Sequence, residues 1–223
     1  SSISKKALWV RKRDGVSSKV SSFVKGLYDQ YLSRSSSVVF RPKIDDSLVS
    51  DFLSSFNFVD TKDQAASYSD IYNDFSSPAP MDRLLCGDVG FGKTEIAMRA
   101  AFIAVLQKSP VVVLCPTTVL CHQLYESFDA RLAPFSVNVG SVSRLNKTSE
   151  VEELVNLFND GGVDVLVCTH RVFSYLNKIK RVGFLIVDEE HKFGVKQKDL
   201  FLEKFPKIDI LMMSATPIPR TLQ

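Results

Sequence analysis

Gly87-Asp-Val-Gly-Phe-Gly-Lys-Thr94, preceded by the apolar run Leu84-Leu-Cys86, matches the pattern G-x-x-x-x-G-K-[ST] at every required position. A helical pattern over residues 95–107 follows it, and a strand before and a helix after are the context expected of a phosphate-binding loop. Glycines let backbone N–H groups close around phosphate oxygens, and the helix N-terminus adds a favourable dipole. We therefore expect nucleotide contacts from Gly87, Asp88, Val89, Gly90, Phe91, Gly92, Lys93, Thr94 and Glu95.

The chemistry of this loop indicates ATP and Mg²⁺ as cofactors. Lys93 is expected to reach the β and γ phosphates, and the Thr94 hydroxyl to bind Mg²⁺. A second candidate site is the apolar run Phe184–Val187, which ends in Asp188-Glu-Glu-His191. Acidic residues at a strand end are often only a solvated turn, but together with the phosphate loop they favour catalysis. Asp188 is predicted to hold Mg²⁺ and Glu189 to activate the attacking water, with Lys93 completing the catalytic set.

Downstream of residue 83, short apolar runs alternate with longer segments of mostly helical pattern. This alternation predicts an α/β fold with a largely parallel sheet covered by helices on both faces. The expected strands are 83–86, 111–115, 136–140, 163–168, 183–188 and 208–213. Upstream, Asp46 or Ser47 is predicted to cap a short helix, and Thr61 to begin a longer one. Residues 1–34 have helical spacing with one apolar face, which predicts a helix packed on the following domain.

Composition excludes several classes of protein. With 223 residues, 45% hydrophobic and 24% charged, the chain is long enough for one domain and an appendage. The net charge of +3 permits nucleic-acid binding without indicating it. Membrane association is not expected, because a spanning helix needs about 20 consecutive apolar residues and the sequence has no such run. Four cysteines without C-x-x-C spacing indicate neither a zinc site nor disulfides, and a cytoplasmic location is expected.

The phosphate loop and the Asp-Glu-Glu-His segment resemble the corresponding motifs of superfamily-2 helicases and translocases. Four further segments resemble other motifs of that family: Thr61-x-x-Gln64, residues 116–123, Thr169-His-Arg171 and Ser214-Ala-Thr216. The resemblance implies a RecA-like phosphate-loop domain at residues 41–223, preceded by a helix and linker at 1–40. It also implies an ATP-dependent DNA translocase or helicase, nearly inactive here because a second motor domain would be missing.

Longer runs are similar to the bacterial transcription-repair coupling factors, namely residues 81–102, 187–195 and 215–222. This similarity implies movement along double-stranded DNA without sequence preference and displacement of stalled RNA polymerase. It also implies recruitment of excision repair through UvrA, with the polymerase-binding and UvrA-binding modules largely outside this chain. Two alternatives stay open: a fork-remodelling helicase resembling RecG, and a nucleotide-binding switch without catalysis.

The resemblance also implies roles for individual residues. Gln64 would contact adenine with Phe58 stacking on it, although Thr61-x-x-Gln64 fits a helix-capping box equally well. His170 has two open interpretations, a DNA-backbone contact or a buried core residue. Cys121 and His122 depart from the usual Ala and Gln, which weakens the case for a contact there. The candidate DNA contacts are Thr117, Thr118, Arg144, Thr169, His170 and Arg171, and the candidate coupling residues are His191, Ser214, Thr216 and Arg220.

Overall fold

A computed structural model describes residues 34, 37–88, 90–188 and 195–215. The chain divides into two compact units, Ser1–Ser37 and Val38–Gln223. The helix expected over residues 1–34 lies outside the described residues except for Arg34.

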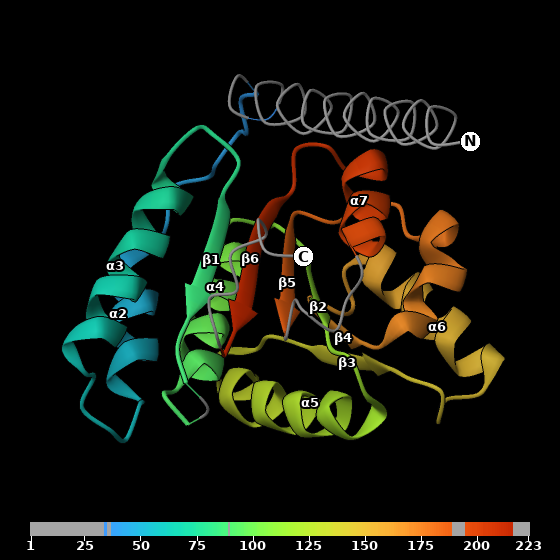
Figure 1. Ribbon diagram of the computed structural model, residues 1–223, viewed down its shortest axis with the longest axis horizontal. Helices are drawn as coiled ribbons and strands as arrows, with labels where there is room; N and C mark the ends of the chain where they lie inside the picture. Colours follow the sequence, from blue (N-terminus) through green and yellow to red (C-terminus); the bar gives the residue numbers. More distant parts are fainter. Residues whose placement is uncertain (1–33, 35–36, 89, 189–194, 216–223) are drawn as a thin grey trace, which may run out of the picture. The chain divides into compact units, whose positions relative to one another are not determined.

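The second unit contains a parallel sheet whose described strands follow the order β1-β6-β5-β2-β4-β3 (Figure 1). Every neighbouring pair is parallel, which confirms the predicted fold class. β2 and β4 are buried at every position, as the continuous apolar runs predict, whereas β1 and β3 at the two edges are only partly buried. The strands are β1 (Asp82–Cys86), β2 (Val111–Leu114), β3 (Val139–Val142), β4 (Val165–Cys168), β5 (Phe184–Asp188) and β6 (Asp209–Ser214).

Several expected boundaries differ from the structure, two of them for a clear physical reason. The third strand begins at Val139 and not at residue 136, because the 3-10 helix η1 (Ala133–Phe135) and the left-handed Ser136, with φ 58°, precede it. The short upstream helix is capped by Asp45 and not by Asp46 or Ser47. The Asp45 carboxylate accepts hydrogen bonds from the backbone of Ser47 and Leu48, at 3.0 and 3.3 Å.

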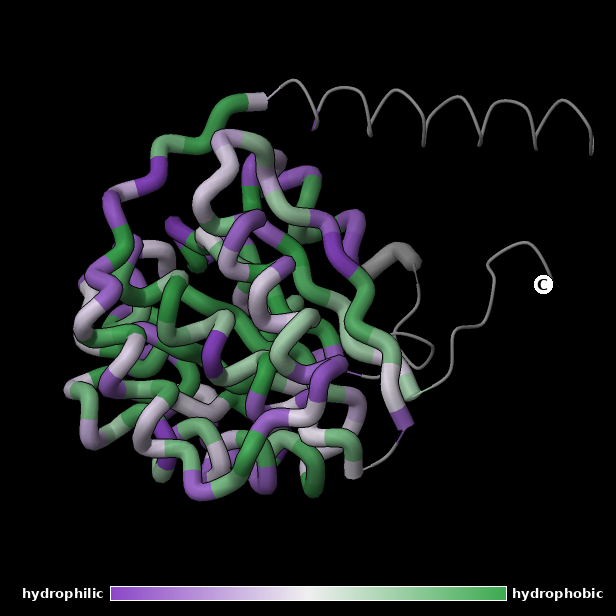
Figure 2. Tube along the Cα trace, turned by 90° about the vertical axis from the view of Figure 1, so that its left-hand side faces the viewer, coloured by the Kyte–Doolittle hydropathy of each residue, from purple (hydrophilic) through white to green (hydrophobic). Residues whose placement is uncertain are grey.

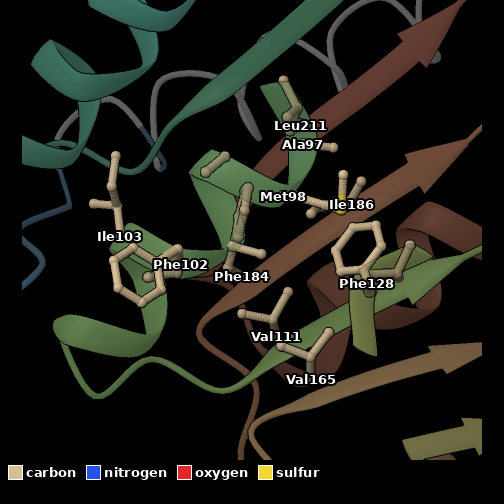
Figure 3. Close-up of a cluster of buried hydrophobic side chains, with 14 of the residues drawn as sticks. Ala97, Met98, Phe102, Ile103, Val111, Phe128, Val165, Phe184, Ile186 and Leu211 are labelled. Atoms are coloured by element: carbon tan, nitrogen blue, oxygen red, sulfur yellow. The ribbon is translucent and has the colours of Figure 1, made fainter. Parts of the chain in front are cut away.

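Helices cover both faces of the sheet and pack on two separate hydrophobic clusters. One face carries α2 (Asp46–Ser54), α3 (Lys62–Ser76), α4 (Lys93–Leu106) and α5 (Thr118–Leu132). The other face carries α6 (Thr148–Asp160), the 3-10 helix η2 (His170–Lys178) and α7 (Val195–Lys204). Figure 2 shows hydrophobic segments through the interior of this unit, and Figure 3 shows Phe102, Phe128 and Phe184 within the first cluster.

The extended segment before α2 is tied to the sheet by a buried ion pair. The Arg41 guanidinium donates to both carboxylate oxygens of Asp209 in β6, at 2.8 Å each. Asp209 also accepts a 2.6 Å hydrogen bond from the backbone N–H of Met81, and its side chain is only 2% exposed. This pair therefore joins the start of β1, the start of β6 and the segment that leads into the unit.

All described strands run in the same direction, so their carboxyl ends meet at one edge of the sheet. The phosphate loop follows β1, and residues 116–118 follow β2. Arg144 lies in the loop after β3, Thr169 follows β4, and Asp188 and Ser214 are the last residues of β5 and β6. Segments that are far apart in the sequence are thereby gathered at this edge, where α/β sheets bind their ligands.

Candidate nucleotide site and adjoining groove

The phosphate loop joins the end of β1 to the first turn of α4. Gly92 is the N-cap of α4 and has φ 74°, a left-handed conformation that glycine adopts without steric cost. The helix begins at Lys93, two residues earlier than expected. The Lys93 ammonium donates to the carbonyls of Gly87 and Asp88, at 2.5 and 2.9 Å, so it lies over the loop that would hold phosphate. Val89 lies outside the described residues.

A cavity of about 300 Å³ lies between the phosphate loop and the start of α3. Five of the predicted nucleotide contacts line it: Gln64, Gly87, Asp88, Phe91 and Lys93. The lining also includes residues not predicted, among them Thr61, Asp63, Ser67, Cys86, Ile96 and Ala215. Thr61 and Ala215 belong to segments that the sequence did single out, so those segments meet the phosphate loop in one place.

Gln64 uses both ends of its amide. Its Oε1 accepts a 2.9 Å hydrogen bond from the backbone of Thr61, which together with the Thr61 hydroxyl completes the capping box of α3. Its Nε2 donates 2.9 Å to the carbonyl of Phe91 in the phosphate loop. The structure therefore realises the capping interpretation and adds a contact to the loop, while adenine contact stays a prediction.

Phe58 and Glu95 are among the predicted nucleotide contacts that do not line the cavity. The Phe58 side chain is 76% exposed and contacts the ring of Phe56, with centroids 5.4 Å apart. The Glu95 side chain is buried and is held by two arginines, Arg99 at 3.0 Å and Arg131 at 3.1 Å. Glu95 was expected among the nucleotide contacts, but its carboxylate is committed to these ion pairs because burial of a charge requires partners.

Arg99 extends this cluster to the segment that precedes α3. Its guanidinium makes a bidentate pair with Asp60, at 2.7 and 2.9 Å, and is only 2% exposed. Burial lowers the pKa of Arg99, but the hydrogen bonds and charges of Asp60 and Glu95 raise it above its ordinary value. The Asp60–Arg99 pair was missed by the sequence analysis, because the two residues lie 39 positions apart and no spacing rule connects them.

The acidic strand end is only partly described. Asp188 is half-buried as the last residue of β5, in register with Met213 of the neighbouring β6. The Gly87 backbone N–H donates to the Ser214 carbonyl at 3.2 Å, so the end of β6 contacts the start of the phosphate loop. Oxygen donors such as the Thr94 hydroxyl and the Asp188 carboxylate suit Mg²⁺, which takes few protein ligands besides phosphates and water. Glu189, His191, Thr216 and Arg220 lie outside the described residues.

The six predicted DNA contacts line one open groove of about 710 Å³ at the ends of β2 and β4. The Thr117 hydroxyl caps α5 by accepting from the backbone of Leu120 at 3.2 Å. Arg171 donates to the Arg144 carbonyl at 3.3 Å, which joins two of the loops. His170 is exposed, which contradicts the buried alternative. The lining comprises Pro116, Thr117, Thr118, Arg144, Thr169, His170, Arg171, Ser174 and Tyr175.

Three groove residues were not predicted, and helical spacing from Arg171 would have found Ser174 and Tyr175.

Cys121 is fully buried in α5, whereas His122 is exposed and pairs with Glu126 at 3.4 Å. Neither residue lines the groove. In the part of the chain that the structure describes, no helix is long and apolar enough to cross a membrane.

A parallel sheet with a G-x-x-x-x-G-K-T loop after its first strand, and a carboxylate at a neighbouring strand end, defines a phosphate-loop nucleotide-binding domain. Residues 61–223 match the model of the DEAD/DEAH box helicase family, and the chain belongs to that family. The fold is accordingly RecA-like, as predicted.

Individual relatives show which members of the family this chain is similar to. The chain is 42% identical over 214 residues to the transcription-repair-coupling factor of Haemophilus influenzae, covering 96% of this chain and 19% of that protein. It is 48% identical over 171 residues to the same factor from Myxococcus xanthus, covering 77% of this chain and 14% of that protein. The predicted resemblance to these factors is confirmed, although the chain spans less than a fifth of either relative.

A solved structure of RecG bound to a three-way DNA junction also resembles this chain. The TM-score is 0.73 at 31% identity, and the match covers 86% of this chain and 26% of the RecG chain. Both types of relative named from the sequence motifs are therefore found, one by sequence and one by structure.

Proposed function

We propose that this chain is the ATP-binding motor domain of a double-stranded DNA translocase of the transcription-repair coupling type. The observation that carries the proposal is the arrangement at one sheet edge. The cavity beside the phosphate loop and the groove lined by Thr117, Arg144 and Arg171 both lie at the carboxyl ends of the parallel strands. Strands of the one sheet connect the two sites, and packed elements of this kind can carry energetic coupling between a nucleotide site and a DNA site.

The nucleotide site would divide its work among four residues. Lys93 would leave the carbonyls of Gly87 and Asp88 and contact the β and γ phosphates. The Thr94 hydroxyl and the Asp188 carboxylate would hold Mg²⁺, which when bound neutralises charge on those phosphates. Glu189 would orient the attacking water and accept its proton. ATP and Mg²⁺ are thus the cofactors that this donor set fits.

The groove is suited to the DNA backbone. Its hydroxyls, backbone N–H groups and two arginines match phosphate oxygens, and such contacts carry no sequence information. We therefore propose binding without sequence preference that weakens as salt rises, because neutralising phosphates releases counterions. Ser214 supports coupling between the sites, since its carbonyl holds the start of the phosphate loop at 3.2 Å. His191, Thr216 and Arg220 are proposed as further coupling residues.

The activity of the whole protein is also a proposal. The chain spans 19% of the Haemophilus influenzae factor, so displacement of RNA polymerase and recruitment of repair through UvrA would require parts beyond this region. We place the protein in the cytoplasm and take residues 1–40 as a helix and linker leading into the motor at 41–223. The similarity to RecG favours one alternative, a helicase that remodels forked DNA.

The test measures ATP hydrolysis by the full-length protein with and without duplex DNA, and then release of a stalled transcription complex. A translocase is expected to hydrolyse ATP faster with DNA, and a coupling factor also to release the complex. Remodelling of forked DNA without release of the stalled transcription complex would support the RecG-like alternative. Nucleotide binding with no DNA-stimulated hydrolysis would contradict the motor function and leave a switch.

Two variants test the assignment of roles within the nucleotide site. Glu189→Gln keeps the side-chain size but cannot accept a proton, so ATP binding should persist while hydrolysis stops. Lys93→Ala removes a cation from the phosphates, so ATP binding itself should weaken. Calorimetry beside steady-state hydrolysis distinguishes them. Equal loss of binding in both variants would contradict the role given to Glu189.

A further inference from the structure

The segment that enters α3 is fastened to the phosphate-loop helix by one buried side chain. Arg99 lies on α4, two turns after the phosphate loop, and its guanidinium makes the bidentate pair with Asp60. Asp60 directly precedes Thr61, the N-cap of α3. A bidentate Arg–carboxylate pair fixes the relative orientation of both groups as well as their distance.

The same guanidinium also holds aromatic rings on both sides of Asp60. It lies 5.0 Å from the centroid of Phe56 and 5.7 Å from that of Tyr68. Phe56 in turn contacts Phe58, the residue expected to stack on the base. Arg99 therefore contacts the segment before α3, the residue that directly precedes the N-cap and the body of the helix at once.

Glu95 anchors Arg99 in the core of the unit. The Arg99 Nε atom donates to Glu95 Oε1 at 3.0 Å. Arg131 of α5 donates to both Glu95 oxygens, at 3.1 and 3.3 Å, and to the carbonyl of Phe52 at 2.8 Å. Two arginines and two carboxylates make this cluster electrically balanced, which a buried set of charges requires.

The segment that Asp60 begins forms one wall of the nucleotide cavity. Thr61 and Gln64 line the cavity, and Gln64 Nε2 bonds the Phe91 carbonyl of the phosphate loop. The phosphate end of the cavity is instead built by Gly87, Asp88 and Lys93, whereas the hydrogen bonds that Arg99 makes to described residues go to Glu95 and Asp60. A shift of Asp60 would thus act first on the wall that carries Thr61 and Gln64, whereas Gly87, Asp88 and Lys93 would keep the hydrogen bonds that they make with one another.

We propose that Arg99 is a positioning residue that, through Asp60, sets the nucleoside-binding wall of the cavity at its distance from the phosphate loop. The inference rests on the proposed ATP site and deepens it. Binding of the nucleoside part depends on the Asp60–Arg99 pair, whereas binding of the phosphate part depends on the loop alone.

The test compares ATP with inorganic tripolyphosphate by calorimetry on the whole chain. Asp60→Asn removes the charge of the pair but leaves Arg99 bonded to Glu95. ATP affinity is expected to fall about tenfold, the equivalent of about 1.4 kcal/mol, with tripolyphosphate affinity changed less than about twofold. Asp60→Glu, which keeps the charge, should recover most of the ATP affinity. Asp70→Asn is the matched control, because Asp70 pairs with Arg83 on the exposed side of α3 and should affect neither ligand.

A second variant keeps the test decisive if Asp60→Asn lowers stability. Arg99→Lys keeps a cation but loses the fork, so it should show the same selective loss. Adding Asp60→Asn to Arg99→Lys should cause no further loss, since both act through one pair.

Each remaining outcome counts against the proposal. Equal loss of ATP and tripolyphosphate would mean that the pair supports the phosphate loop, and unchanged binding of both would mean that the cluster only stabilises the fold. Wild-type chain that binds neither ligand would overturn the proposed nucleotide site itself. Wild-type chain that binds both ligands equally would overturn the inference alone.

Discussion

Removing the buried Asp209 carboxylate should destabilise the domain more than removing one partner of any exposed ion pair. The Asp209→Ala variant leaves the Arg41 guanidinium buried without a countercharge, although it keeps its bonds to the carbonyls of Ser77 and Ala79. The Met81 N–H also loses its acceptor. The substitution therefore affects three segments at once. Asp209 begins β6, Met81 precedes β1 and Arg41 lies in the segment before α2.

The magnitude follows from burial of the pair, whose side chains are 8% and 2% exposed. Breaking a buried pair by removing one partner costs about 3–5 kcal/mol, because the remaining charge is left in a poorly hydrated site. With a urea dependence of about 2 kcal/mol per M, the unfolding midpoint should fall by about 1.5–2.5 M. The melting temperature should fall by about 6–20 °C, at about 2–4 °C per kcal/mol for a domain of this size.

Urea unfolding followed by far-ultraviolet circular dichroism measures this loss. Glu152→Ala is the control, because the Lys178–Glu152 pair is shorter, at 2.6 Å, but exposed, and its removal should leave the midpoint unchanged. The double variant Arg41→Met with Asp209→Ala should be more stable than Asp209→Ala alone, since no orphaned charge remains. A double variant no better than the single one would refute the reasoning, as would an Asp209→Ala midpoint equal to that of the control.

Three further predictions concern the nucleotide site and its surroundings. Gly92→Ala should weaken ATP binding at least about tenfold by calorimetry, because φ is 74° and the added Cβ would lie 2.4 Å from Gln64 Nε2; unchanged affinity would contradict this. Cys86 should be the one thiol labelled quickly by Ellman's reagent in the folded chain, and ATP should slow the reaction, because Cys86 lines the cavity while the other three are buried; rapid labelling of two thiols would argue against the fold. Burial raises the pKa of Tyr68 to about 12 from 10.0, so the folded state favours the neutral phenol. The free energy of unfolding should therefore fall as pH rises from 10 to 12. In urea titrations at alkaline pH, the Tyr68→Phe variant should show a smaller fall.

Most of the fold could be predicted from the sequence because its strands carry unambiguous patterns. β2 and β4 are continuous apolar runs, and continuous runs separated by helical segments indicate a doubly covered parallel sheet. The errors fall at the ends of helices and strands, where a single hydrogen bond can determine which residue begins the element. Asp45 and not Asp46 caps α2, and the 3-10 turn before Ser136 delays β3, and neither choice changes the hydrophobic pattern.

The residues of the candidate site also fall into those that the sequence could predict and those that it could not. Residues of the phosphate loop and the groove could be predicted, because each motif follows a strand and parallel strand ends converge. The cluster around Glu95 could not, since Arg131 reaches it from 36 positions away and Asp60 reaches Arg99 from 39. Only the Glu95–Arg99 pair, at i,i+4, carries a spacing signal, and that signal is equally typical of an exposed helix.

The pairing of β1 with β6 affects the order in which parts of this domain can fold during synthesis. Among the described strands β1 pairs only with β6, and the Met81–Asp209 hydrogen bond spans 128 residues. On a translating ribosome, β1 must remain unpaired until β6, its only neighbour among the described strands, has been synthesised. At about 5–20 residues per second this wait lasts roughly 6–26 s. Nascent chains arrested before residue 209 should therefore bind no ATP, while chains released only slightly later should acquire binding in a single step.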